Sequence, residues 1–298
     1  QLPLLYKELS EMTGYEMSLP MNSGAEAVET AIKLARKWAY QVKGVPRHRA
    51  EIIVCDGNFH GRTITTISFS SEPLYKEDFG PFTPGFVSIP YGDSAAIERA
   101  ITSNTAAVML EPLQGEAGVI TPPEGFLKKV SEICKKNNVL FIADEIQTGP
   151  GRTGKLFACD HEGVRPDVTI IGKALSGGFY PVSAILADET VLGLFSPGEH
   201  GSTFGGNPLG AAVARASLRV IRDENLADRA EELGTYLMEQ LAEIPSPYVE
   251  DVRGKGLLIG VELKPEAQGA RRFCEALQER GILTKETHEH VIRFAPPL

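Results

Sequence analysis

Residues 139–149, VLFIADEIQTG, decide the fold, because an apolar run of strand length passes directly into Asp144. A second apolar run, residues 168–171, is followed after one glycine by Lys173. Short apolar runs bounded by turn residues are typical of buried strands. The sequence therefore predicts two buried strands, one that ends on a carboxylate and one that ends on an amine.

The chemistry of these two strand ends suggests one shared ligand. In α/β proteins, ligands bind beyond the carboxyl ends of parallel strands, so Asp144 and Lys173 can face the same molecule. A lysine amine can form a Schiff base with an aldehyde cofactor, and an aspartate can keep a pyridine nitrogen protonated. The pair fits pyridoxal phosphate. Each residue alone has an ordinary explanation, since a charged residue often marks the point where a strand reaches solvent.

Composition limits the classes of protein. The 298 residues are 42% hydrophobic, enough for one large domain plus a smaller one. A net charge of -9 gives no basic footprint for nucleic acid. No apolar run approaches the roughly 18 residues of a membrane helix. We expect a soluble protein whose partners are small-molecule substrates, with neither nucleic acid nor a membrane among them.

The cysteines bear on compartment and on metal binding. The four are widely scattered and form no CxxC pair: Cys55, Cys134, Cys159 and Cys274. This spacing favours a reducing compartment and argues against a metal site. We expect the cytoplasm. The mitochondrial matrix stays open, because the chain starts at Gln1 rather than methionine and is expected to be a segment of a longer protein.

Alternating strand and helix patterns predict the architecture. Strands are expected at residues 51–55, 86–89, 106–110 and 182–187, and helices at 95–101, 124–137 and 209–223, with another helix starting at Gly24. This order is typical of a doubly wound, mostly parallel α/β sheet. After residue 224 a helix at 226–243 precedes a strand at 257–263, a helix at 270–280 and strands at 282–285 and 291–294. We expect a large domain, 1–224, and a small α+β domain, 225–298, each lacking a terminal part.

The start of the helix at Gly24 is a candidate anion site. A helix N-terminus offers unpaired N–H groups and the positive end of its dipole, and the Ser23-Gly24 pair lets a phosphate approach closely. The alternative is an ordinary helix cap by Ser23.

The loop NFHGRT, residues 58–63, follows the strand at 51–55. Phe59 can stack on a planar ring, and Arg62 can grip a carboxylate through its bidentate fork. Core packing and a solvated surface charge are the alternatives for these two. A lone loop histidine is more often structural, so His60 is given no acid–base role beyond a possible ring contact.

Two longer motifs carry a family resemblance. ADEIQTGPGRTG, residues 143–154, followed by GKALSGGFYPVSA, residues 172–184, resembles the class III aminotransferases of fold type I, and the likeness runs from about Met21 to Leu298. The resemblance implies pyridoxal phosphate as cofactor and a homodimer with shared active sites. The motifs at residues 177–184 and 287–298 favour members that pass the δ-amino group of ornithine to 2-oxoglutarate. N-acetylornithine and 4-aminobutyrate remain alternative amino donors.

The same resemblance implies roles for individual residues. Lys173 is expected to form the Schiff base and to carry protons, and Asp144 to be its electronic partner. Ser23, Gly24 and Ala25 would bind the cofactor phosphate, together with Thr203 from the neighbouring subunit. Phe59 and Ile146 would contact the two faces of the cofactor ring. Gln147 would bind the ring hydroxyl. Arg62 and Arg293 would recognise substrate carboxylates, with Glu116 as the switchable partner of Arg293.

Two functions of other classes compete. Residues 149–155, GPGRTGK, match the spacing of a phosphate-binding P-loop, but Leu156 replaces the Ser or Thr that would hold magnesium. The second is a catalytically inactive scaffold. A scaffold has no need for the joint presence of Lys173, Asp144, Gln147, Arg62 and Arg293, and this argues against it.

Overall fold

The computed structural model describes all 298 residues. Its larger sheet has seven strands in the order β1-β7-β6-β5-β4-β2-β3. Five of them are parallel neighbours and supply the predicted α/β core: β3 (Phe86–Ile89), β2 (Glu51–Cys55), β4 (Thr105–Leu110), β5 (Leu140–Asp144) and β6 (Val168–Ile171). The mostly parallel sheet, flanked by helices and joined to a smaller sheet, confirms the predicted fold class.

One strand departs from the parallel pattern. β7 (Ser183–Ala187) runs antiparallel to both β6 and β1 (Met17–Met21). The connection from β6 to β7, residues 172–182, holds only a short 3-10 turn. A parallel crossover needs a dozen or more residues, usually with a helix, so this short link reverses the chain. β1 was not predicted, and Pro20 within it suits the edge position that it takes.

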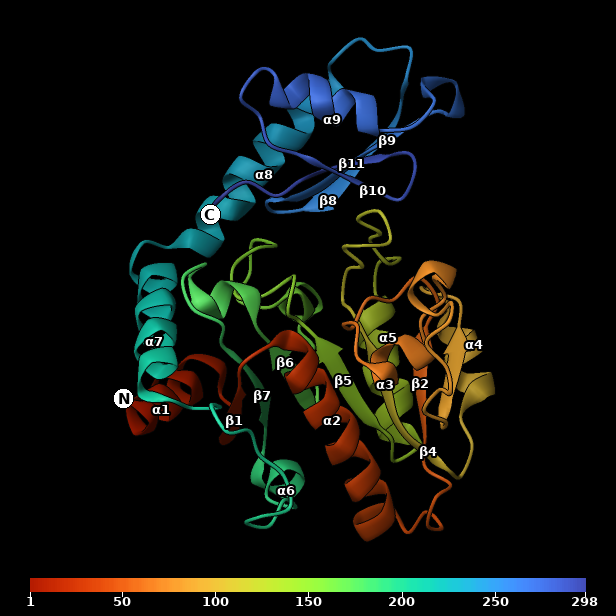
Figure 1. Cartoon of the computed structure of the whole chain (residues 1–298), viewed down its shortest axis with the longest axis vertical. Coiled ribbons are helices and arrows are strands. Elements are labelled where there is room, and N and C mark those ends of the chain that lie inside the picture. Colours follow the sequence, from red (N-terminus) through yellow and green to blue (C-terminus); the bar gives the residue numbers. More distant parts are fainter.

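Helices cover both faces of this sheet (Figure 1). Alternate strand residues pack against α2 (Gly24–Trp38) on one face, Ile142 among them. The intervening residues, such as Phe141, pack against α4 (Ser94–Ala100) and α5 (Phe126–Lys136) on the other face. The same face carries α1 (Leu2–Thr13) and α7 (Pro208–Asp223) over the β6 and β7 end. Because both faces are covered, β5 is buried along its whole length. Two short helices, α3 (Ile64–Ser68) and α6 (Glu189–Leu192), complete this part.

The C-terminal part forms a separate four-stranded antiparallel sheet in the order β10-β11-β9-β8. Its strands are β8 (Val249–Lys255), β9 (Leu258–Leu263), β10 (Lys285–Thr287) and β11 (Val291–Phe294), with α8 (Leu226–Ala242) and α9 (Arg271–Gln278) packed against them. Figure 1 places this sheet above the carboxyl ends of the parallel strands. We propose the domain boundary at residues 224–225, because α7 packs against α1 whereas α8 packs against β8.

Several local predictions need correction. The strand expected at 282–285 lies instead at Lys285–Thr287, where its residues pair with β11. α1 and β8 were not anticipated; β8 is only partly buried and lacks a continuous apolar run. None of the helices combines the length and the apolar character that a membrane span requires. The P-loop alternative is wrong, because the residues after Lys155 form a short 3-10 turn at Ala158–Glu162 rather than a phosphate-binding helix.

Candidate active site

The parallel register brings the two predicted catalytic residues to the same edge of the sheet. β5 ends on Asp144, which is the register partner of Ile170 on β6, and Lys173 follows two residues after β6 ends. Both line a cavity of about 210 Å³. Its other walls are Gly24, Ala25, Phe59, His60, Gly61, Glu111, Ile146 and Gln147. Seven of the twelve residues predicted for the site therefore meet in one cavity.

Asp144 is buried at the floor of this cavity and its orientation is defined by two hydrogen bonds. Its Oδ2 lies 2.7 Å from Nδ1 of His60, and its Oδ1 accepts the N–H of Ile146 at 3.1 Å. The role of His60 was missed from the sequence. The available signal was that His60 follows β2, whose carboxyl end lies at the same sheet edge as that of β5.

His60 and Glu111 place two further titratable groups behind Asp144. Burial disfavours a charge on His60, but its hydrogen bond to Asp144 and the nearby negative charges outweigh this and raise the His60 pKa. Burial raises the pKa of Glu111 to about 7, against the opposing charge of His60. The Glu111 Oε2 atom accepts the N–H of Phe59 at 3.0 Å, whereas Oε1 has no partner. The hydrogen bond to Asp144 and the nearby carboxyl of Glu111 thus favour the protonated form of His60.

Lys173 is displayed by an unusual backbone conformation. Its φ angle of 35° is in the left-handed region, and the Ser176 hydroxyl donates a hydrogen bond to the Lys173 carbonyl at 2.6 Å. The side chain remains accessible because it projects into the cavity. Desolvation by the cavity walls lowers the Lys173 pKa, although the negative charge of Asp144 opposes the shift. A lower pKa favours the neutral amine, which is the nucleophilic form.

The N-terminus of α2 is the predicted anion site. Ser23 caps the helix in a capping box, and the carboxylate of Glu26 accepts the N–H groups of Asn22 and Ser23 at 2.8 Å each. The N–H groups of Gly24 and Ala25 precede the first intrahelical bond and are available to a ligand. The cap by Ser23 is confirmed, and it leaves the N–H groups of Gly24 and Ala25 to the anion site, which stays a prediction.

Close packing at two glycines shapes the cavity. A Cβ atom at Gly24 would lie 3.0 Å from Cδ1 of Ile146, and one at Gly115 would lie 2.5 Å from Oε1 of Gln147. Larger residues at either glycine would displace these side chains. Phe59 and Ile146 line the cavity with apolar surface, and Gln147, Asp144 and the N–H groups of Gly24 and Ala25 supply its polar groups. This combination suits an aromatic ring that carries a hydroxyl, a basic nitrogen and a phosphate. The residues present fit pyridoxal phosphate.

Glu116 and Arg293 meet although 177 residues separate them. Arg293 Nη1 donates to Glu116 Oε1 at 2.6 Å, and Lys285 Nζ donates to Oε2 at 3.2 Å. The partial burial of Glu116 raises its pKa, but the bonds from Arg293 and Lys285 dominate and lower it overall. Lys285 was not predicted from the sequence. The pair joins the loop after β4 to strand β11 of the small sheet.

Five predicted residues do not line this cavity: Ser23, Glu116 and Arg293, described above, and Arg62 and Thr203. Arg62 is exposed, and its guanidinium carbon lies 5.3 Å from the ring centroid of Tyr75 and 5.7 Å from that of Phe59. Thr203 is also exposed, in the loop before α7. Its neighbour Ser202 accepts a hydrogen bond from Asn22 at 2.8 Å, so this loop lies close to the N-terminus of α2.

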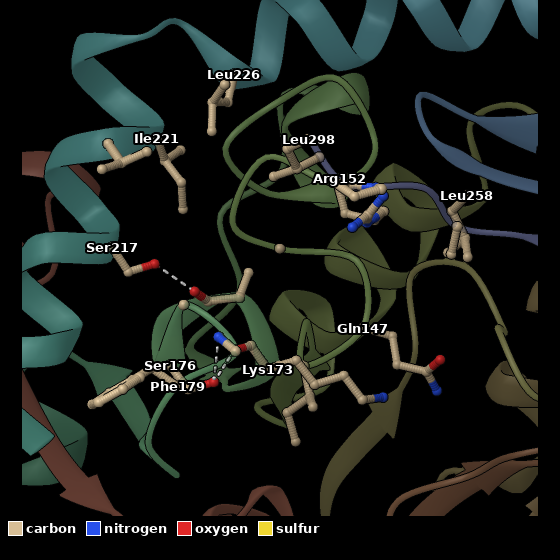
Figure 2. Close-up of a pocket in the computed structure, with 18 of the residues that line it drawn as sticks. Gln147, Arg152, Lys173, Ser176, Phe179, Ser217, Ile221, Leu226, Leu258 and Leu298 are labelled. Atoms are coloured by element: carbon tan, nitrogen blue, oxygen red, sulfur yellow. Dashed lines mark hydrogen bonds between the residues drawn. The ribbon is translucent and has the colours of Figure 1, made fainter. Parts of the chain in front are cut away.

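A larger cavity of about 980 Å³ adjoins the first and shares Ile146, Gln147 and Lys173 with it. Arg293 lines this space, together with apolar residues of α7 and the small sheet. Figure 2 shows the Lys173 side chain extending from its turn in the direction of Gln147, with Ser176 bonded to the Lys173 backbone. The amine is thus reachable from the side where Arg293 lies.

The chain is similar in sequence and in structure to known aminotransferases. The family model for class-III aminotransferases matches residues 1–298. Ornithine aminotransferase of Brevibacillus brevis is 62% identical over all of this chain and 74% of its own length. A crystal structure of the Toxoplasma gondii ornithine aminotransferase, with partial occupancy of PLP at its active site, has a TM-score of 0.97 and 48% identity over 99% of this chain and 71% of its own. Acetylornithine aminotransferase from Elizabethkingia anophelis has a TM-score of 0.89 and 54% identity, covering 99% of this chain and 74% of its own.

Proposed function

The chain belongs to the class-III aminotransferase family, pyridoxal-phosphate-dependent enzymes that act on an amino acid and an oxo acid, and from this premise we propose that it transfers the δ-amino group of ornithine to 2-oxoglutarate. The products would be glutamate 5-semialdehyde and glutamate. The observation that carries this choice of substrates is the Glu116–Arg293 ion pair beside the Lys173 cavity.

We propose that the cofactor is held by the residues that the resemblance indicates. Ser23, Gly24 and Ala25 would bind its phosphate, Phe59 and Ile146 its two ring faces, Gln147 its hydroxyl and Asp144 its pyridine nitrogen. Lys173 would hold it covalently. When bound, the cofactor supplies an aldehyde that takes up the amine and a ring that accepts electrons from the substrate carbon.

Lys173 is then the proton carrier of the reaction. Its amine, with a pKa lowered by burial, can take the proton from the carbon that bears the reacting amine and return a proton to product. The negative charge of Asp144 would keep the pyridine nitrogen of the cofactor protonated. His60 keeps the Asp144 carboxylate oriented through its 2.7 Å hydrogen bond. The hydrogen bond to Asp144 raises the pKa of His60 and so favours its role as a donor to that carboxylate.

The ion pair addresses a problem of substrate choice. Ornithine has two amines, and an arginine that gripped its α-carboxylate near the cofactor would present the wrong one. Glu116 occupies Arg293, so we propose that ornithine reacts through its δ-amine while the pair is closed. 2-Oxoglutarate needs the grip of Arg293, and Glu116 would then move aside, with Arg62 as the second carboxylate site. The contact between Arg293 and a substrate carboxylate then stabilises 2-oxoglutarate in its reactive orientation and does not stabilise ornithine with its α-amine at the cofactor.

N-acetylornithine is the second candidate amino donor, favoured by the 54% identity to the Elizabethkingia anophelis enzyme. A substrate with a blocked α-amine needs no device to choose between two amines, so the Glu116–Arg293 pair supports ornithine. The test is a panel of ornithine, N-acetylornithine and 4-aminobutyrate, with 2-oxoglutarate as acceptor and the full-length protein as enzyme. We expect the highest kcat/KM with ornithine. A higher value with N-acetylornithine would replace the proposal by the second candidate.

We also propose a homodimer in which Thr203 of one protomer contacts the cofactor phosphate of its partner. The support is the exposed loop at Thr203, close to the N-terminus of α2 but outside the cavity of its own chain. Sedimentation of the holoenzyme tests the dimer, and weaker cofactor binding in Thr203→Ala would support the shared site. The four cysteines are unpaired and buried, in keeping with a reducing compartment, and we propose the cytoplasm.

A further inference from the structure

Four residues stand in register across the small sheet. Arg253 on β8 pairs with Gly260 on β9, Gly260 pairs with Arg293 on β11, and Arg293 pairs with Lys285 on β10. Directly opposed residues on neighbouring strands lie on the same face of a sheet. The row therefore presents three cations and one glycine together, facing the loop at residues 115–119 that follows β4.

One half of the row fixes the backbone of this loop. Arg253 donates from Nε to the Val119 carbonyl at 3.0 Å and from Nη2 to the Gly118 carbonyl at 2.8 Å. A Cβ atom at Gly260 would lie 2.9 Å from Cβ of Val119, so only glycine lets the loop approach so closely. Val119 is fully buried with φ of 53°, a rare conformation for a β-branched residue. The loop is thus attached to the sheet without using the Glu116 carboxylate.

The other half of the row binds that carboxylate twice. Arg293 contacts Oε1 of Glu116 at 2.6 Å, and Lys285 contacts Oε2 at 3.2 Å. The Arg293 side chain is 17% exposed and that of Lys285 is 60% exposed, so the lysine lies on the solvent side of the carboxylate. The two cations hold different oxygens, and one bond can therefore break while the other remains.

We propose that Lys285 is the positioning residue that retains Glu116 when Arg293 is released to a dicarboxylate substrate. The inference rests on the proposed switch and gives it a physical route. Because Arg253 and Gly260 hold the loop backbone at Gly118 and Val119, we take the movement of Glu116 to be a rotation of its side chain. A carboxylate that left Arg293 without another partner would be stranded unpaired in a partly buried site, which is unfavourable. Lys285 removes that cost.

The test uses binding of glutarate, a dicarboxylate with no reacting group, to the cofactor-loaded enzyme by calorimetry. We expect Lys285→Gln to weaken glutarate binding about two- to fivefold, the range for an exposed ion pair, because Lys285 is the sole partner of Glu116 once Arg293 is released and is one of two partners before. In a Glu116→Ala background the same substitution should have no effect. Lys285→Arg should restore binding, and Lys255→Gln, which removes the same charge from the same sheet, should leave it unchanged.

Two results would overturn the proposal. If Lys285→Gln lowers the glutarate affinity equally in the wild-type and Glu116→Ala backgrounds, Lys285 attracts the dicarboxylate directly. If it lowers the affinity in neither background, Lys285 has no part in the release of Arg293. Neither result depends on the amino donor. The ornithine half-reaction, followed separately by single-turnover absorbance, tests the proposed function, so failure of the one is distinguished from failure of the other.

Discussion

The Nδ1 atom of His60 lies 2.7 Å from Oδ2 of Asp144, and both side chains are buried. The bond ties the loop after β2 to the end of β5. Without it, Asp144 would retain only the N–H of Ile146 as a hydrogen-bond donor. A hydrogen bond to a charged group contributes roughly 1.5 to 3 kcal/mol, so its loss is large enough to measure at the cofactor site.

We predict that His60→Leu weakens cofactor binding about ten- to hundredfold, by removing the donor that orients Asp144. Titration of the apoenzyme with pyridoxal phosphate, followed by absorbance, measures the change. His60→Asn keeps a donor near the same position and should lose less. Equal affinities for wild type and His60→Leu would reduce His60 to a packing residue.

The covalent role of Lys173 predicts that Lys173→Ala abolishes the visible absorption of the protein-bound cofactor. Borohydride reduction followed by peptide mass spectrometry should locate the cofactor on Lys173 in the wild type and nowhere in the variant. Lys155→Ala, at an exposed lysine, is the control and should behave as wild type. An adduct on another lysine, such as Lys155, in the Lys173→Ala protein would show the assignment to be wrong.

Asp144→Asn preserves the shape of the side chain and removes its charge. Transamination should fall by orders of magnitude, since the pyridine nitrogen would no longer be held protonated. Single-turnover rates of both half-reactions give the measurement, and Asp228→Asn on the exposed surface of α8 controls for net charge. Near-normal rates in Asp144→Asn would exclude the electronic role.

Glu111 predicts a dependence of stability on pH. Burial raises its pKa from 4.5 in the unfolded chain to about 7 in the folded protein. Below pH 4.5 the carboxyl is protonated in both states and its contribution is fully present; this stability is lost as pH rises through 7, by about 3 kcal/mol in total. Glu111→Gln cannot titrate. Urea denaturation at several pH values should show wild type losing stability relative to the variant between about pH 4.5 and 7, with no further change above that range, and a constant difference would refute the shift.

The ion pair between Glu116 and Arg293 predicts a change of selectivity. Glu116→Ala leaves Arg293 free to grip an α-carboxylate, so the half-reaction with glutamate should speed up relative to that with ornithine, by about ten- to hundredfold in their ratio. Reaction of ornithine through its α-amine, in place of its δ-amine, should also increase. Stopped-flow rates for the two amino acids provide the ratio. If the ratio stays at its wild-type value, Glu116 has a structural role only.

The sequence by itself determined the parts of the site that depend on local patterns. Apolar runs identify β5 and β6, whose ends carry Asp144 and precede Lys173, and Ser23 before an apolar helical period identifies the start of α2. These signals are local because strand length, helix capping and helical periodicity are set within a few residues. The Glu116–Arg293 contact was reached only through the family resemblance.

The tertiary structure alone decided which distant residues meet. The pairing of β7 with β1 on one side and β6 on the other is set in the assembled sheet, and the role of His60 depends on its contact with a residue 84 positions away. The row from Arg253 to Lys285 depends on the registers of three strand pairs, which no single segment encodes. Register and loop approach are settled by how buried faces pack against one another, and that free energy belongs to the assembled fold rather than to any stretch of its sequence.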